Sequence, residues 1–321
     1  MPHRTVRLLM IVAACVVVST CAAPATKTRV SFPQGGDLSA LGLAPCDPSQ
    51  REILLAPNRP LTLLVHGCNA SGGKFRILSQ VFEEHGQQTV CFNYNDRDSL
   101  ETSARQLRKA IASLLERQGR PELNILGHSQ GGLVSRRALV REGNTSPIHP
   151  QEAAIRLVTV SSPFDGIKAS ADCGSLGYRV LTLGLTAAIC RLAVGSKWNE
   201  IHPRAEFIRA PGLLEEAVNI HIAVQTDELG TCLRRDDQGR CAQGDFVFSL
   251  EEQHNASIEA DRRVASRKLA AGHSEVVGQD GAAPWKLIRL LQAEKILNET
   301  PPEKRESIAR LIEALFAEHA S

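Results

Sequence analysis

Short apolar runs that alternate with amphipathic segments limit the fold of this chain more than any other feature of its sequence. Five runs have the length and composition of strands buried on both faces of a sheet, at 61–67, 89–94, 122–127, 155–162 and 218–225. Segments with apolar residues at helical spacing separate the first four runs, at 74–86, 100–119 and 131–143. Because strands that alternate with helices build a mostly parallel sheet with helices on both faces, the sequence predicts an α/β fold.

The C-terminal part of the chain continues this pattern. A strand is predicted at 262–270 and a helix at 283–297. Residues 21–60 contain many Pro, Gly and Ser residues and predict an irregular lead-in. We therefore expect one α/β domain at 61–298, followed by a C-terminal amphipathic helix within 299–321.

The first twenty residues differ from the rest. A basic start is followed by an eleven-residue apolar run at 8–18 and then by small residues. This order predicts a secretory signal peptide at 1–20, because the run is too short to span a bilayer comfortably; the alternative is an uncleaved anchor. Cys21 follows Val-Ser-Thr, which resembles the bacterial lipobox, and lipidation there would anchor the protein to a membrane. The alternative is ordinary cleavage a few residues later. We expect an exported protein, either secreted, periplasmic or membrane-anchored.

The charge balance argues against a nucleic-acid partner. Without Arg4 and Arg7 of the signal peptide, the 37 basic residues become 35, equal to the 35 acidic residues. The sequence has no basic stripe and no module of stacking aromatic residues. It also has no CxxC, HExxH or His-rich motif, so neither a metal nor a cofactor is predicted.

The cysteines fit an exported protein, because nine in one chain are more common in oxidising compartments. Cys173 with Cys190, and Cys232 with Cys241, are candidate disulfides that would each close a short loop. The remaining cysteines of the mature domain have no pairing that the sequence decides. They are Cys46, Cys68 and Cys91.

One strand runs directly into a helix through Gly127-His128-Ser129-Gln130-Gly131. A serine hydroxyl is a weak nucleophile that must protrude from the backbone and have a base beside it. A sharp turn between strand and helix makes the serine protrude, and the flanking glycines leave room for the two elements to cross closely. The helix N-terminus also directs N–H groups toward developing negative charge. We therefore expect Ser129 to be a nucleophile.

Three motifs together resemble the α/β-hydrolase fold, and within it the bacterial lipases and esterases. They are Val-His-Gly at 65–67, Gly-His-Ser-Gln-Gly-Gly at 127–132 and Val-Thr-Val-Ser-Ser-Pro-Phe-Asp-Gly at 158–166. The resemblance covers roughly residues 60–290. It implies an oxyanion hole made by the backbone N–H groups of Cys68 and Gln130. In this family a lid is commonly inserted between two late core strands, here at about 165–215, and we expect the apolar segment 176–195 either to cover an acyl-chain pocket or to pack on the core.

The family's chain order is nucleophile, acid, histidine. Of the histidines beyond the plausible acid regions, His273 follows a predicted strand in a loop preceded by glycine, as the family's catalytic histidine does. His66 and His128 are expected to pack or hydrogen-bond around the site. For the acid, Asp245 opens Asp-Phe-Val-Phe-Ser-Leu-Glu-Glu-Gln, which resembles the lipase pattern at this residue, while Asp227 directly follows a strand. We favour Asp245 and keep Asp227 as the alternative.

These residues predict a serine carboxylic ester hydrolase of lipase or esterase type that works through an acyl-enzyme on lipid-like esters. An acyltransferase or thioesterase on the same fold, or a non-catalytic binding protein, is the alternative. The expected partners are a small ester or lipid substrate and a membrane surface. The sequence does not specify the acyl chain length, the head group or the oligomeric state.

Overall fold

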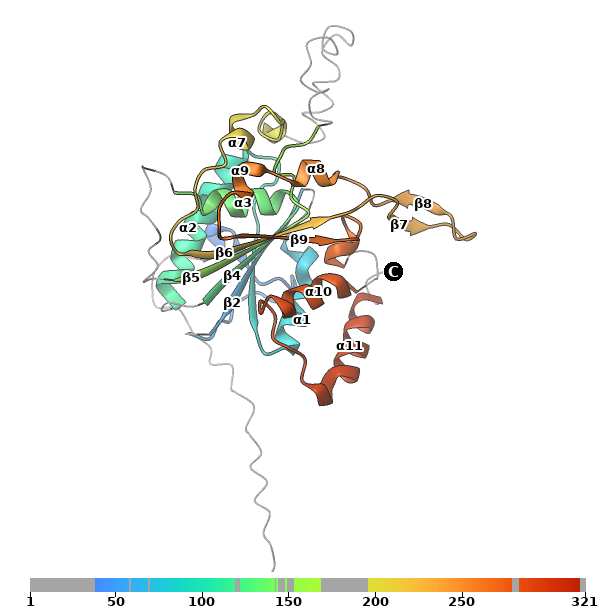
Figure 1. Cartoon of the computed structure of the whole chain (residues 1–321). Helices are drawn as coiled ribbons and strands as arrows, with labels where there is room; N and C mark the ends of the chain where they lie inside the picture. Colours follow the sequence, from blue (N-terminus) through green and yellow to red (C-terminus); the bar gives the residue numbers. More distant parts are fainter. Residues whose placement is uncertain are drawn as a thin grey trace, which may run out of the picture.

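A computed structural model describes residues 38–57, 59–68, 70–118, 122–141, 143, 148, 153–168, 196–278 and 283–317. Its centre is a seven-stranded sheet in the order β1-β3-β2-β4-β5-β6-β9, in which β1 is antiparallel to β3 and every other pair is parallel (Figure 1). The strands are β1 (Leu43–Ala44), β2 (Leu61–Val65), β3 (Gln88–Phe92), β4 (Glu122–His128), β5 (Ala154–Val160), β6 (Val218–Thr226) and β9 (Val264–Leu269). The parallel α/β sheet predicted from the sequence is confirmed.

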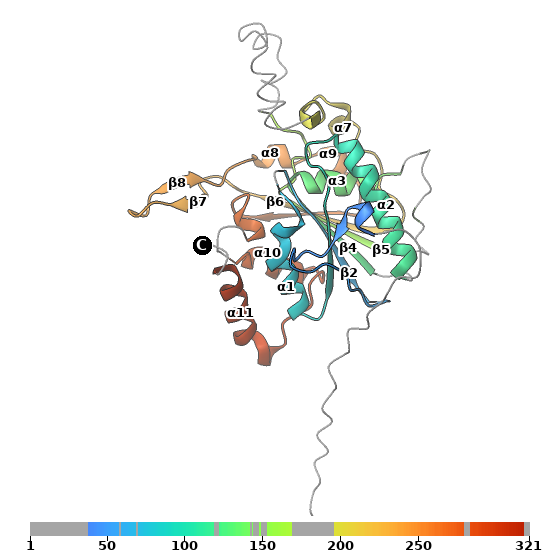
Figure 2. The same cartoon turned by 180° about the vertical axis from the view of Figure 1, so that it is seen from behind.

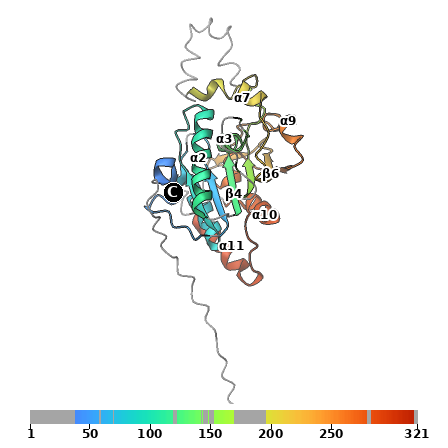
Figure 3. The same cartoon turned by 90° about the vertical axis from the view of Figure 1, so that its left-hand side faces the viewer.

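Helices cover both faces of this sheet, each over its own apolar core. On one face, α2 (Leu100–Gln118) and α3 (Gln130–Ala138) pack over side chains such as Leu63 and Ile125 (Figures 1 and 3). On the other face, α1 (Arg76–Glu84), α10 (Trp285–Ala293) and α11 (Arg305–Ala317) pack over Leu64, Leu126 and their neighbours. Successive residues of a strand point to opposite faces, so an uninterrupted apolar run is what two buried faces require.

The described part of the lead-in, from residue 38 onward, is fixed to the sheet. The short strand β1 pairs with β3, and a disulfide joins Cys46 to Cys91 of β3. Both half-cystines are buried. The sequence left the pairing of these two cysteines open. Cys68 has a free and exposed thiol.

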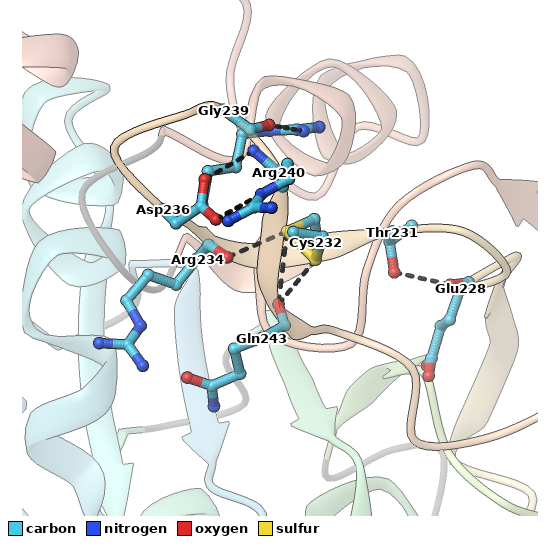
Figure 4. Close-up of a disulfide and its surroundings, with 10 residues drawn as sticks. Glu228, Thr231, Cys232, Arg234, Asp236, Gly239, Arg240 and Gln243 are labelled. Carbon is cyan, nitrogen blue, oxygen red and sulfur yellow. Dashed lines mark hydrogen bonds and ion pairs between the residues drawn. A yellow bond between two sulfur atoms is a disulfide. The ribbon is translucent and has the colours of Figure 1, made fainter.

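An exposed hairpin of β7 (Cys232–Arg235) and β8 (Cys241–Gly244) interrupts the chain between β6 and α8 (Leu250–Gln253), which α9 (Ala256–Glu259) follows. It extends away from the body of the molecule, as Figures 1 and 2 show from opposite sides. The predicted disulfide between Cys232 and Cys241 is confirmed and joins its two strands (Figure 4).

The predicted lid falls largely on residues that the structure does not describe. Residues 169–195, with Cys173, Cys190 and the apolar segment, lie outside the described part of the chain, as do the predicted signal peptide and Cys21. The described chain resumes with a 3-10 helix at Ser196–Asn199 and α7 (Glu206–Arg209) before β6. No helix among the described residues is long and apolar enough to cross a membrane.

The two disulfides should contribute differently to stability. The Cys46–Cys91 bond links positions 45 residues apart and ties the lead-in to the core, so Cys46→Ala/Cys91→Ala should lower the free energy of unfolding by about 2–4 kcal/mol. The matched control, Cys232→Ala/Cys241→Ala, removes a bond in an exposed hairpin and should leave global unfolding nearly unchanged. Urea unfolding followed by circular dichroism measures both, and equal losses would contradict this assignment.

Candidate active site

Ser129 lies in a strained turn between β4 and α3. Its backbone has φ 57° and ψ −126°, a conformation that costs energy for a residue with a side chain. The turn is fixed on both sides, because the Ser129 N–H donates to the carbonyl of Val160 at 2.8 Å and the Ser129 carbonyl accepts from the Gly132 N–H at 3.0 Å. Strain that the surrounding fold enforces in this way is typical of a functional position.

The glycines beside Ser129 provide the clearance that this turn needs. A Cβ atom at Gly127 would lie 2.5 Å from the carbonyl oxygen of Gly131, and one at Gly131 would lie 2.2 Å from the carbonyl oxygen of Val65. Both distances are far below van der Waals contact, so α3 crosses the ends of β2 and β4 only with glycine at these positions. This agrees with the role that the sequence predicts for the two glycines.

His273 reaches the same edge of the sheet from the loop after β9. Its ring nitrogen Nδ1 lies 3.0 Å from Oε1 of Glu228 and 2.9 Å from the hydroxyl of Ser161. The Phe248 ring packs edge-on against the imidazole, with ring centroids 4.9 Å apart. Nδ1 is thus directed at the carboxylate, and His273 lines the same cavity as Ser129.

The carboxylate beside His273 is buried and fully hydrogen-bonded. Oε1 of Glu228 accepts from the hydroxyls of Ser161 at 2.6 Å and Thr226 at 2.9 Å, in addition to His273. Oε2 accepts from the backbone N–H groups of Val247 at 2.6 Å and Phe248 at 2.9 Å. A carboxylate out of contact with water needs such donors to remain charged.

These donors determine the pKa of Glu228. Burial raises the pKa of its carboxyl, but the hydrogen bond and charge of His273, with the hydrogen bonds from Ser161 and the Phe248 N–H, outweigh burial and hold the pKa below its ordinary value. Glu228 therefore stays ionised at neutral pH. An ionised carboxylate at Nδ1 keeps the proton on that nitrogen, which leaves the other ring nitrogen able to accept one.

The imidazole of His273 is bonded to Glu228 and not to the carboxylate of Asp245 or Asp227, the two acids that the sequence predicts. The Asp245 carboxylate accepts from the backbone N–H groups of Ser274 and Glu275 at 2.9–3.0 Å, and its carbonyl accepts from the His273 N–H at 2.9 Å. Asp245 thus holds the histidine loop by its backbone. Asp227 points outward, where its carboxylate lies 3.0 Å from the ammonium of Lys268.

The alternation of side chains along a strand explains why Glu228, and not Asp227, reaches His273. Asp227 is the first residue after β6, and the next residue, Glu228, points to the opposite side, toward His273. The hairpin that follows Glu228 is drawn in Figure 4. It returns the chain to Asp245, so the longer motif match lies near His273 without supplying the partner of its ring. The sequence did contain a signal for Glu228. Glutamate also serves as the acid in this fold, and Glu228 directly follows the alternative acid Asp227.

Two further histidines support the site as expected. Nε2 of His128 lies 2.9 Å from the carbonyl oxygen of His273, and since a carbonyl can only accept, Nε2 carries the proton. Burial and the nearby charge of His273 lower the pKa of His128 to about 3, so it stays neutral. His66 stacks on the Tyr94 ring at 4.5 Å between centroids, and burial lowers its pKa.

Ser129 and His273 line a cavity of about 180 Å³ together with Cys68, which follows β2. A Cβ atom at Gly67 would lie 3.0 Å from the Cβ of Ser129, so the backbone before Cys68 runs directly beside the serine. Gln130, the first residue of α3, follows Ser129. The two residues expected to donate to an oxyanion therefore flank the serine. Among the described residues, no group of three or more His, Cys, Asp or Glu residues could hold a metal ion.

Comparisons with known proteins concern the fold of the chain. The model of the palmitoyl protein thioesterase family matches residues 62–214. Among solved structures, the propeptide form of lipase BlEst2 from Bacillus licheniformis superposes with a TM-score of 0.54 at 12% identity, over 77% of this chain and 53% of that one. Lipase B from Aspergillus fumigatus gives 0.48 at 15% identity, over 88% of this chain and 67% of that one. Comparison with curated proteins found no significant match.

The lowered pKa of Glu228 predicts a pH-dependent contribution to stability. A carboxyl whose pKa is lower in the folded state stabilises the fold above its ordinary pKa of 4.5 and loses that contribution as the pH falls through the folded value. The stability gap between wild type and Glu228→Gln should therefore narrow from pH 7 to pH values below about 4. Urea unfolding across this range measures the gap, with the exposed Glu303→Gln as control. A constant or widening gap would contradict the assignment.

Proposed function

From the α/β-hydrolase fold, which the sequence predicts and the structural likeness to a bacterial lipase confirms, we propose that this protein is a serine ester hydrolase of lipase or esterase type. One observation carries the proposal: the strained Ser129 and His273 line one cavity, and a buried, ionised Glu228 holds Nδ1 of the histidine. Structural scaffolds do not need a nucleophile, a base and an orienting acid in this relation.

The proposed reaction passes through an acyl-enzyme. Ser129 attacks the carbonyl carbon of the ester while His273 takes the hydroxyl proton and passes it to the leaving alcohol. The N–H groups of Cys68 and Gln130 hold the negative charge that develops on the carbonyl oxygen. Water, activated by His273, then releases the acid. Glu228 keeps the histidine in the required tautomer and stabilises its cation.

We propose lipid-like carboxylic esters as substrates and an exported protein as their enzyme. The predicted signal peptide and the two disulfides in the described chain support export, and lipidation of Cys21 would place the site at a membrane surface. The apolar segment 176–195 would supply the cover for an acyl chain. Hydrolysis of p-nitrophenyl esters of increasing chain length tests this substrate class, with acetyl preference as the contradicting result.

A thioesterase is the second candidate, because the palmitoyl protein thioesterase model matches a stretch that contains Ser129. The same serine, histidine and oxyanion hole serve both reactions, since both pass through an acyl-enzyme. Comparing kcat/KM for palmitoyl thioesters and palmitoyl oxyesters separates them, and added alcohol acceptors detect acyl transfer. A clear preference for the thioester would favour this candidate.

Ser129→Ala should abolish activity while leaving the fold intact. Alanine removes only the attacking hydroxyl, so kcat should fall by about three orders of magnitude or more, with little change in the melting temperature. The wild type should also be labelled by a fluorophosphonate probe, which reacts only with an activated serine, and Ser129→Ala should not. Labelling of the variant, or near-full activity in it, would reject Ser129 as the nucleophile.

Replacing each acidic residue near His273 distinguishes their roles. Glu228→Gln should lower kcat by about two to four orders of magnitude, because glutamine no longer favours the required histidine tautomer. Asp245→Asn should lower kcat less, because only one of the two oxygens that hold the histidine loop becomes an N–H₂ group. The kcat of Asp227→Asn should stay within about two-fold of wild type. Steady-state kinetics on one soluble ester measures all three. A crippled Asp245→Asn beside an active Glu228→Gln would restore the sequence-based prediction.

A further inference from the structure

Lys197 is a buried lysine whose charge the proposed reaction does not use. It belongs to the 3-10 helix at Ser196–Asn199, within the predicted insertion, and it is 1% exposed. Lys and Glu side chains are rarely buried unless a specific partner holds them. Its surroundings therefore need an explanation beyond packing.

The ammonium of Lys197 contacts three segments at the carboxyl edge of the sheet. It donates to the side-chain oxygen of Gln130 and to the backbone carbonyl of Asp96, and it lies 3.1 Å from the sulfur of Cys68. The Asp96 carboxylate lies 3.9 Å away. Three ammonium hydrogens thus have three acceptors. Two of these belong to the residues whose backbone N–H groups form the proposed oxyanion hole.

Further contacts fix both ends of this arrangement. The Gln130 amide also donates to the Asp96 carbonyl at 3.1 Å, so the side chain is held at its oxygen and its nitrogen. On the other side, the Glu200 carboxylate accepts from the Ser99 hydroxyl at 2.7 Å and from the Leu100 N–H at 2.5 Å, at the start of α2. Lys197 therefore projects from an anchored segment onto Gln130, and a restrained side chain restrains the backbone N–H of its own residue.

Burial of an ammonium is costly, and an apolar side chain would anchor the insertion without this cost. The lysine instead joins the loop after β2 to the first residue of α3, and these are the two segments that must keep a fixed separation around an oxyanion. We propose that Lys197 is a positioning residue of the oxyanion hole. This inference rests on the proposed function and adds to it the part that sets the geometry of the two N–H donors.

Lys197→Met and Lys197→Arg test the proposal on the full chain. Methionine keeps most of the apolar stem of the lysine but lacks the ammonium. Because the N–H donors of Cys68 and Gln130 would then be misplaced, kcat should fall by about 10- to 100-fold while KM stays within about two-fold of wild type. Affinity for a trifluoromethyl ketone, which forms a tetrahedral oxyanion with the serine, should fall by the same factor as kcat/KM. Arginine, which retains a cation and its N–H donors, should recover part of both losses.

The matched control is Lys168→Met, also within the predicted insertion, where an exposed lysine pairs with Glu251. It should behave as wild type. If Lys197 serves stability alone, Lys197→Met will lower the melting temperature while kcat and ketone affinity of the folded protein stay at wild-type values, which would overturn the proposal. Should Lys197→Met not fold, wild-type kinetics in the folded Lys197→Gln would overturn it equally.

Failure of the proposed function has a different result. If the wild type hydrolyses no ester or thioester and binds no ketone, the enzyme assignment itself fails. If the wild type is active, Ser129→Ala is inactive and Lys197→Met equals the wild type, only the role of Lys197 fails.

Discussion

The close crossing of α3 over the ends of β2 and β4 is the constraint on which the site depends. The crossing needs glycine at 127 and 131, because any Cβ atom there would overlap a backbone carbonyl. It also forces Ser129 into a strained conformation with positive φ, which hydrogen bonds to β5 and α3 maintain. The stability of the buried sheet around Ser129, whose parallel strands are apolar on both faces, offsets the energetic cost of this strain. A protruding serine is thus a consequence of how the sheet and helix pack.

A second constraint acts on the histidine, which stands on a loop and not on a regular element. Its backbone is held from two directions, by Asp245 through N–H groups and by His128 through the carbonyl. Its ring is held by Glu228 and faces the edge of Phe248. Ser161, another residue with positive φ, donates to the same carboxylate. Strained or buried polar residues therefore gather at this edge of the sheet, as expected where side chains must be oriented for chemistry.

The sequence predicted the parts of this protein that depend on local patterns. Apolar runs and helical spacing located β2 to β6, and the glycines around Ser129 located the turn, because each effect acts within a few neighbouring residues. The pairing of Cys46 with Cys91 depends on β1 joining β3, and two residues of strand give almost no sequence signal. The sequence missed Glu228 as the carboxylate at His273 for a related reason. Which of Asp227 and Glu228 faces inward depends on where β6 ends, and an exposed hairpin separates both from Asp245.

Lys197 shows most clearly why part of the site could not be predicted. Its contacts come from the loops after β2 and β3 and from the first residue of α3, and it is distant from all of them in sequence. Nothing in the sequence around Lys197, which lies between an apolar segment and a strand, distinguishes a buried lysine from an exposed one. Only the common carboxyl edge of the parallel strands brings these segments together. The same edge places the carboxylate of Glu228 at the histidine and the ammonium of Lys197 at the oxyanion segments. The carboxylate then lies at the imidazole, on which the proposed reaction would develop a cation. The ammonium lies at the side chains of Cys68 and Gln130, the two residues whose N–H groups are proposed to hold the oxyanion.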